Sequence, residues 1–241
     1  MIELRHKSDS ENLRDGYDQI FQADTLAQHE MTYRWLMNQL KPAPGKRLLD
    51  VACGDGPLLS KSAQCEIESF GIDFSAVALR SAATQLPDSR LALSNGENIP
   101  YADNSFDYVT NIGSLEHYEL IEQGCQEMAR VLKPSGTAMI LLPNMFGMLW
   151  NVQYVKHTGD VCDDGQPLQR YATPGAWHRL LEANGFVVNE MLPFGWAWPM
   201  TWRDWLYYLK QPKLLLVLFV WQPRHFPNLA NTLVYMCQKR G

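Results

Sequence analysis

The chain has 241 residues, of which 46% are hydrophobic and 20% are charged, and its formal net charge is −5. This composition is typical of a globular domain with a sizeable core, and the negative charge argues against a nucleic-acid partner, which requires a basic surface. The five cysteines are scattered and form no Cys-x-x-Cys pair, so neither a disulfide framework nor a metal site is expected. The first residues lack the apolar core of a signal peptide, and we expect a cytoplasmic protein.

Strands and helices are predicted in alternation along most of the chain. Residues 11–40 have helical character and predict a cover over about residues 1–44. From residue 47 onward, apolar runs alternate with helical segments, which predicts a largely parallel sheet. Strands are predicted near 47–53, 69–74, 90–95, 106–112, 137–143, 186–191 and 232–237. Helices are predicted near 57–65, 75–86, 120–132 and 173–184, and Ser75 is placed to cap the second of these.

Two segments exceed the usual length of a connection, at about residues 144–172 and 194–228. We interpret both as insertions that form covers or extra helices. The second is rich in Trp and Tyr and contains an apolar run over 214–221, which is far shorter than the ~20 residues needed to cross a bilayer. Packing as a lid is the first interpretation. Binding of a hydrophobic or sugar-bearing substrate, and shallow contact with a membrane surface, remain alternatives.

The end of the first sheet strand carries a glycine turn. Residues 50–56 read Asp-Val-Ala-Cys-Gly-Asp-Gly, and Asp50 stands where open α/β sheets bind their ligands. Gly54 and Gly56 permit close approach of a ligand to the backbone. The third glycine of a dinucleotide fingerprint and the Gly-Lys-Ser/Thr of a phosphate loop are both missing. Because Asp50 and Asp55 would repel phosphates, the turn favours a cationic ligand.

These residues resemble the first motif of the class I S-adenosylmethionine-dependent methyltransferases, Asp/Glu-x-x-x-Gly-x-Gly. Three further segments resemble later motifs of this family in the same order, at residues 71–75, 95–109 and 129–137. The similarity covers roughly residues 45–145 and is closest to the small-molecule and quinone-type group. It implies one methyltransferase domain over residues 1–241, with a Rossmann-like, seven-stranded, mostly parallel sheet, an antiparallel last strand and helices on both faces.

The resemblance also implies S-adenosylmethionine as the cofactor and S-adenosylhomocysteine as the product. Asp73 would hold the ribose hydroxyls, Asn95 replaces the Asp that family members often place beside adenine, and Asn111 would lie beside the methionine portion. The cofactor contacts expected on this basis are Asp50, Ala52, Cys53, Gly54, Gly56, Asp73, Phe74, Asn95, Gly96, Glu97 and Asn111.

The acceptor side is less well defined by the sequence. His117 follows the fourth predicted strand, and an imidazole there is a candidate general base. Further candidates for the pocket wall or base are Tyr17, Tyr33, His29, His178 and Trp196. The predicted reaction is methyl transfer to a small molecule, with O-methylation of a natural-product, sugar-bearing or lipid-like acceptor first. Quinone-ring C-methylation, N-methylation and a catalytically silent cofactor-binding partner are alternatives. A monomer and a homodimer both remain open.

Overall fold

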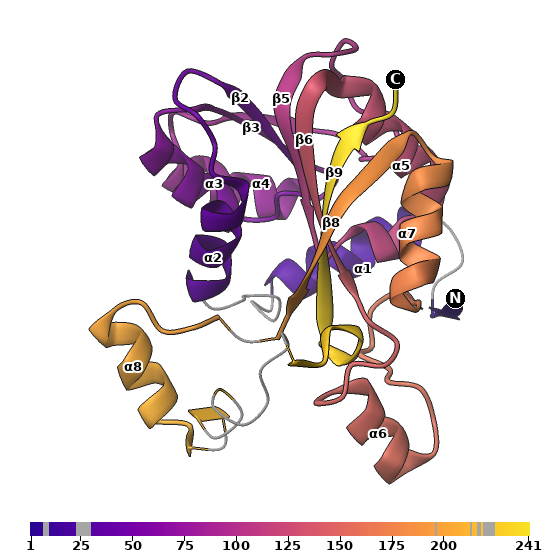
Figure 1. Ribbon diagram of the computed structural model, residues 1–241. Coiled ribbons are helices and arrows are strands. Elements are labelled where there is room, and N and C mark those ends of the chain that lie inside the picture. Colours follow the sequence, from indigo (N-terminus) through magenta and orange to yellow (C-terminus); the bar gives the residue numbers. More distant parts are fainter. Residues whose placement is uncertain (7–9, 23–29, 196, 213, 216–217, 219–224) are drawn as a thin grey trace.

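Seven strands form one central sheet in the computed structural model of the chain (Figure 1). The structure describes residues 1–6, 10–22, 30–195, 197–212, 214–215, 218 and 225–241. Across the sheet the strands follow the order β4-β3-β2-β5-β6-β9-β8. Their bounds are β2 Arg47–Val51, β3 Glu68–Asp73, β4 Arg90–Leu93, β5 Phe106–Ile112, β6 Leu132–Pro143, β8 Phe186–Phe194 and β9 Thr232–Lys239.

The strand directions confirm the predicted fold class. Strands β2 to β6 pair in parallel, whereas β9 runs antiparallel to both of its neighbours, β6 and β8. The chain moves outward from β2 through β3 to β4 and then returns to place β5 on the other side of β2. Ligands of open α/β sheets bind at such a reversal of strand order, so the glycine turn after β2 stands at the expected position.

Helices cover both faces of the sheet (Figure 1). Leu48 and Leu49 of β2 point to opposite faces, as neighbouring strand residues must. Leu48 packs in a cluster with residues of α2 and α3, and Leu49 in a cluster with residues of α5 and α7. The helices are α1 Ser10–Gln22, α2 Glu30–Leu40, α3 Pro57–Ser62, α4 Ala76–Gln85, α5 Ile121–Val131, α6 Asn151–Thr158, α7 Pro174–Ala183 and α8 Trp202–Leu209.

A second, two-stranded sheet departs from the sequence-based expectation. The segment predicted as a helical cover begins with a strand, β1 Ile2–Arg5, which pairs antiparallel with β7 Leu168–Tyr171. β7 lies within the first predicted insertion, which also contains α6. The side chains of β1 alternate between half-buried and exposed, so the strand follows the period of two that a half-buried strand requires.

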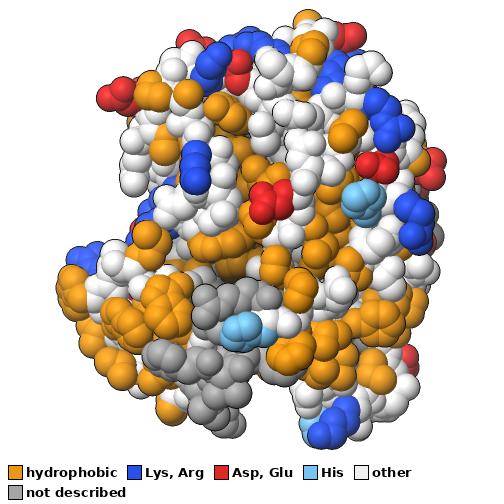
Figure 2. Space-filling model, viewed as in Figure 1, with side chains coloured by type: hydrophobic (Ala, Val, Ile, Leu, Met, Phe, Trp, Pro, Cys, Tyr) orange, Lys and Arg blue, Asp and Glu red, His pale blue; other side chains and the backbone are white. Residues whose placement is uncertain are grey.

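Hydrophobic side chains gather on the surface over α8 and around α6 (Figure 2). Trp202 of α8 is 68% exposed and Trp150, just before α6, is 63% exposed. In the part of the chain that the structure describes, no helix has both the length and the apolar character needed to cross a membrane.

Candidate active site

The turn after β2 has three residues with left-handed backbone. Ala52 has a φ of 60°, Gly54 of 57° and Gly56 of 84°. This conformation is open to glycine but strained for alanine, and strained residues cluster at functional sites. A Cβ on Gly56 would come within 2.5 Å of Leu86 Cδ1, so Gly56 allows α3 and α4 to approach each other.

Two buried carboxyl groups flank this turn. Asp50 is 3% exposed, and its Oδ1 accepts a hydrogen bond of 2.7 Å from Thr110 Oγ1. Asp73 ends β3, and its two oxygens accept bonds from the backbone N–H groups of Gly54 at 2.9 Å and Ser75 at 2.8 Å. Ser75 caps α4 as predicted, by accepting a bond from Ala78 N. Asp73 therefore joins the glycine turn to the start of α4.

Burial changes the protonation of both carboxyl groups. Burial raises the pKa of Asp50 to about 7. The charge of Asp73 raises this pKa further, whereas the hydrogen bond from Thr110 lowers it. Burial raises the pKa of Asp73 to about 6, although the backbone N–H groups favour the charged form. A positive charge placed between these groups would stabilise both carboxylates.

The loop after β4 forms the next part of the site. Glu97 N donates to Asn95 Oδ1 at 3.0 Å, and Leu120 N donates to Glu97 Oε1 at 2.9 Å. A Cβ on Gly96 would lie 2.1 Å from the hydroxyl of Tyr118, so only glycine allows this close packing. Asn95 itself is exposed and remains accessible to a ligand.

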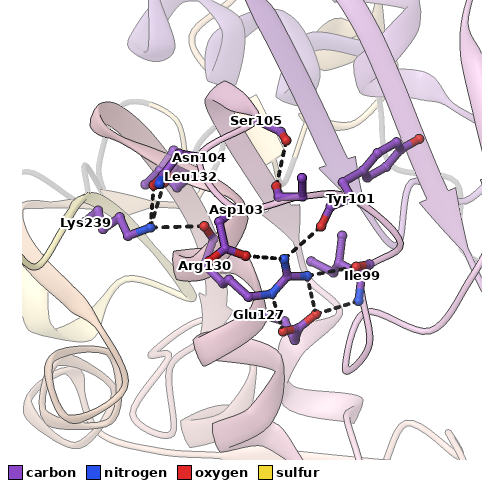
Figure 3. A network of polar contacts seen from close by, with 10 residues as sticks. Ile99, Tyr101, Asp103, Asn104, Ser105, Glu127, Arg130, Leu132 and Lys239 are labelled. Atoms are coloured by element: carbon purple, nitrogen blue, oxygen red, sulfur yellow. Dashed lines mark hydrogen bonds and ion pairs between the residues drawn. The ribbon is translucent and has the colours of Figure 1, made fainter.

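An arginine network holds this loop against α5 (Figure 3). Arg130 of α5 donates to the carbonyl oxygens of Ile99 at 2.9 Å and Tyr101 at 2.8 Å. Its guanidinium also pairs with Glu127 at 2.7 Å and with Asp103 at 2.8 Å. Several charge-assisted bonds on one planar group fix its geometry, so the network determines where the loop that contains Asn95 and Gly96 lies.

A single cavity of about 1190 Å³ connects these parts. It extends from the glycine turn past the turn that follows β5 to residues of the 144–172 segment and of α8. Twelve of the predicted site residues line it: Tyr17, Tyr33, Asp50, Ala52, Cys53, Gly54, Asp73, Phe74, Asn95, Gly96, Glu97 and His117.

Three predicted site residues do not line this cavity. Asn111 is fully buried behind the wall, where its amide donates to Val51 O and Tyr118 Oη and its oxygen accepts from Leu115 N. Gly56 serves the packing of α3 and α4. His178 is on α7, with its side chain 43% exposed and paired with Glu182; its contact with an acceptor stays a prediction that the cavity does not support. His29 and Trp196 lie outside the described residues.

His117 is held in one orientation. Its Nδ1 lies 2.5 Å from the carbonyl oxygen of Leu168 in β7. A carbonyl can only accept, so Nδ1 carries the proton and Nε2 keeps its lone pair in the neutral ring. Burial lowers the pKa of His117 to about 4, which makes the neutral form dominant at pH 7. The centre of the Tyr17 ring lies 5.5 Å from that of Phe74, just after β3, and 5.8 Å from that of His117, after β5. Tyr17 thus lies between the part of the cavity at the glycine turn and the part at His117.

The structure adds cavity residues that the sequence-based interpretation did not select. Glu116 lies beside His117, with Oε1 3.8 Å from His117 Nε2. Gln169, Asn151 and Asp164 come from the 144–172 segment. Glu116 had a weak signal, because it directly precedes the candidate base His117 in the chain. Gln169 had none, since its place depends on the pairing of β7 with β1.

The strand order and the acid-flanked glycine turn define a Rossmann-like fold of the methyltransferase type. Residues 49–140 match the family described as "Methyltransferase domain". This match confirms the predicted resemblance to the class I S-adenosylmethionine-dependent methyltransferases over residues 49–140, and it supports S-adenosylmethionine as the cofactor.

Individual relatives agree with this assignment. A demethylmenaquinone methyltransferase of Staphylococcus epidermidis is 30% identical over 137 residues, which cover 54% of this chain and 57% of the relative. The chain thus spans little more than half the length of the curated relatives it matches.

Solved structures share the fold. A Haloferax volcanii complex between the Trm112 methyltransferase activator and a methyltransferase matches with a TM-score of 0.68 and 18% identity, over 95% of this chain and 98% of that chain. The [4+2] cyclase SpnF matches with a TM-score of 0.63 and 20% identity, over 87% of this chain and 81% of that chain.

The residues around the glycine turn fit S-adenosylmethionine. The backbone of Gly54 borders the cavity without a side chain, and the buried carboxyl groups of Asp50 and Asp73 suit a positively charged nucleoside. Among the described residues that line the cavity there is no Lys or Arg, so a pyrophosphate placed there would meet two buried carboxyl groups and no cationic side chain.

Proposed function

We propose that this protein transfers the methyl group of S-adenosylmethionine to a small-molecule acceptor. The observation that carries this proposal is the cavity that runs from the acid-flanked glycine turn to His117. The cofactor supplies a methyl group already activated by a sulfonium, so the protein contributes mainly positioning and exclusion of water.

The cofactor half of the cavity offers a partner for each part of the nucleoside. Asp73 retains acceptor capacity for the ribose hydroxyls beyond the two backbone bonds that it already accepts. Asn95 offers an amide to the adenine edge. Asp50, and Tyr33 through its position near Asp50 and Asp55, border the region where the methionine portion would lie.

We assign the role of general base to His117 Nε2. Because its pKa is near 4, this imidazole is a weak base and suits an acceptor with an acidic proton. A phenolic hydroxyl or an activated ring carbon meets that requirement, whereas an aliphatic alcohol does not. N-methylation of a neutral amine would need no base.

The relatives help to choose between the remaining acceptors. O-methylation of a natural-product or lipid-like acceptor is the reaction predicted first from the sequence, and quinone-ring C-methylation is the alternative. The relatives named as demethylmenaquinone methyltransferases favour a quinone-type ring, and the exposed aromatic surface over α8 and α6 suits an apolar molecule. We therefore propose an acidic aromatic acceptor, methylated on ring oxygen or ring carbon.

The cytoplasmic location expected from the scattered cysteines is part of this proposal. Whether the protein is a monomer or a homodimer can be measured by light scattering.

Transfer of a tritiated methyl group into a deproteinised cell extract tests the function. We expect labelled product whose mass has increased by one methylene group. Binding of S-adenosylhomocysteine without any labelled product would instead favour the silent partner. The fold is shared with a [4+2] cyclase, and cyclisation within one molecule leaves its mass unchanged. An unlabelled product of unchanged mass but altered chromatographic retention would therefore contradict methyl transfer.

A further inference from the structure

Three buried polar side chains at the acceptor end of the cavity have an oxygen without a hydrogen-bond partner. They are Glu116 Oε2, Gln169 Oε1 and Asn151 Oδ1. Their residues are only 4%, 4% and 6% exposed, and all three line the cavity. A buried polar atom without a partner is costly, so each such atom in a folded protein points to a missing ligand or water.

Two of the unpaired atoms are amide oxygens, which can only accept. The amide of Asn151 donates from Nδ2 to the carbonyl oxygen of Asn144 at 2.8 Å, and since a carbonyl cannot donate, this bond leaves Oδ1 as the unpaired atom. Burial raises the pKa of Glu116 to about 8 in the ligand-free protein, and a bound hydrogen-bond donor or positive charge would favour its ionised form, in which Oε2 accepts. A partner with hydrogen-bond donors therefore fits this set.

Glu116 and Gln169 belong to neighbouring elements. The turn Leu115–His117 lies against β7, because His117 Nδ1 donates to Leu168 O and Arg170 Nη1 donates to Glu116 O at 3.3 Å. Arg170 is directed to backbone carbonyl oxygens and to Glu3, and it does not line the cavity. The local cation is thus already paired and does not neutralise the cavity wall.

The titratable side chains of the cavity wall are acidic, apart from one histidine. The acidic residues that line the cavity are Asp50, Asp55, Asp73, Glu97, Glu116, Glu119 and Asp164. His117 is the only basic residue among the described lining residues. An acceptor with a phosphate or carboxylate would meet acidic groups and no cationic side chain on this wall, which disfavours its binding.

We propose that Glu116 and Gln169 form a specificity subsite that binds O–H or N–H groups of a neutral or positively charged acceptor and excludes anionic acceptors. This inference rests on the proposed methyl transfer and adds the chemical class of the acceptor. Glu116 accepts a hydrogen bond close to the reacting group, while His117 Nε2 receives the proton.

Separation of the labelled products by charge tests the subsite. Deproteinised cell extract is incubated with the protein and tritiated S-adenosylmethionine, and the products are passed over an anion exchanger at pH 7. We expect the label in the unretained neutral and cationic fraction. Label in the retained anionic fraction overturns the subsite but supports methyl transfer. No label in any fraction overturns methyl transfer and the subsite with it.

A matched pair of variants tests Glu116 itself. With a labelled acceptor from the first experiment, Glu116→Gln should raise its KM about tenfold, the effect of weakening one bond to a charged group. The Kd of S-adenosylhomocysteine should stay unchanged, which also shows that the variant is folded. Glu122→Gln, the same change at an exposed position of α5 outside the cavity, is the control. An unchanged KM in Glu116→Gln overturns the role of this residue.

Discussion

Asp73 holds the glycine turn and α4 together and also faces the cavity. Replacing it by Asn removes the charge from the proposed ribose partner, and we expect Asp73→Asn to weaken S-adenosylhomocysteine binding by about 1.5–3 kcal/mol. Titration calorimetry measures this change. Asp88→Asn, at an exposed position, should bind as the wild type does. Equal affinity for both variants would remove Asp73 from cofactor recognition.

Substitution of His117 should affect turnover rather than cofactor binding. We expect His117→Gln to lower kcat by about 10²-fold or more, as is usual for loss of a general base, with little change in cofactor affinity. The unchanged Kd of S-adenosylhomocysteine would show that the variant keeps its fold. The exposed His178 on α7 provides the control, and His178→Gln should keep wild-type turnover. A normal rate in His117→Gln would show that the acceptor needs no base or uses another one.

The buried carboxyl groups make the stability of the ligand-free protein depend on pH. Burial raises the pKa of Asp50 to about 7 and that of Glu116 to about 8, whereas both ionise near pH 4 in an unfolded chain. Their contribution to stability is full below about pH 4 and is lost as pH rises through these folded-state values. His117, with its pKa lowered to about 4, acts oppositely, and its contribution is lost as pH falls below about 6.5.

Above about pH 6.5 the carboxyl groups therefore dominate among these residues. We expect the Tm of the ligand-free protein to fall between pH 6.5 and 8, in a thermal scan by differential fluorimetry. Asp50→Asn and Glu116→Gln should each reduce the slope. A Tm that rises over this interval, with the same slope in both variants, would show that these groups are ionised without penalty.

At the scale of elements, Arg130 links α5 to the loop after β4 through carbonyl and carboxylate partners. We expect Arg130→Ala to lower the free energy of unfolding by about 2–3 kcal/mol, because charged hydrogen bonds are lost and carbonyl oxygens lose their donor. Urea denaturation measures this free energy of unfolding. Arg80→Ala, on the exposed side of α4, should cost less than about 0.5 kcal/mol. Similar losses in both would contradict the clamping role of the network.

The elements that the sequence predicted correctly are those with a local signal. Three features follow from neighbours in the chain: the apolar run of β2 with its glycine turn, Ser75 as the cap of α4, and the positions of Asp50 and Asp73 near the ends of their strands. The pairing of β1 with β7 joins residues such as Leu4 and Gln169, and no local pattern relates them. The surroundings of Asn111 could not be predicted for a related reason: its place near the end of β5 is local, but the direction of its amide depends on Val51 and Tyr118.

At the scale of the whole molecule, the small β1–β7 sheet connects the start of the chain to the acceptor half of the cavity. Glu3 pairs with the buried Arg170 at 2.8 Å, and the adjacent Leu168 orients His117. We expect Glu3→Ala to destabilise the protein by about 1–3 kcal/mol and to lower kcat while cofactor affinity stays the same. Parallel measurements of unfolding, turnover and binding check this. A uniform loss of kcat and cofactor affinity would mean general loosening rather than a link to His117.

The position of β9 has a consequence for biosynthesis. Among the strands that the structure describes, β8 pairs only with β9 in the central sheet, and β9 also pairs with β6. A nascent chain on the ribosome therefore carries two open strand edges until residues 232–239 emerge, and open edges invite pairing between molecules. A premature stop that removed these residues would leave both edges exposed permanently, so such shortened products should accumulate as aggregates rather than as a smaller folded enzyme.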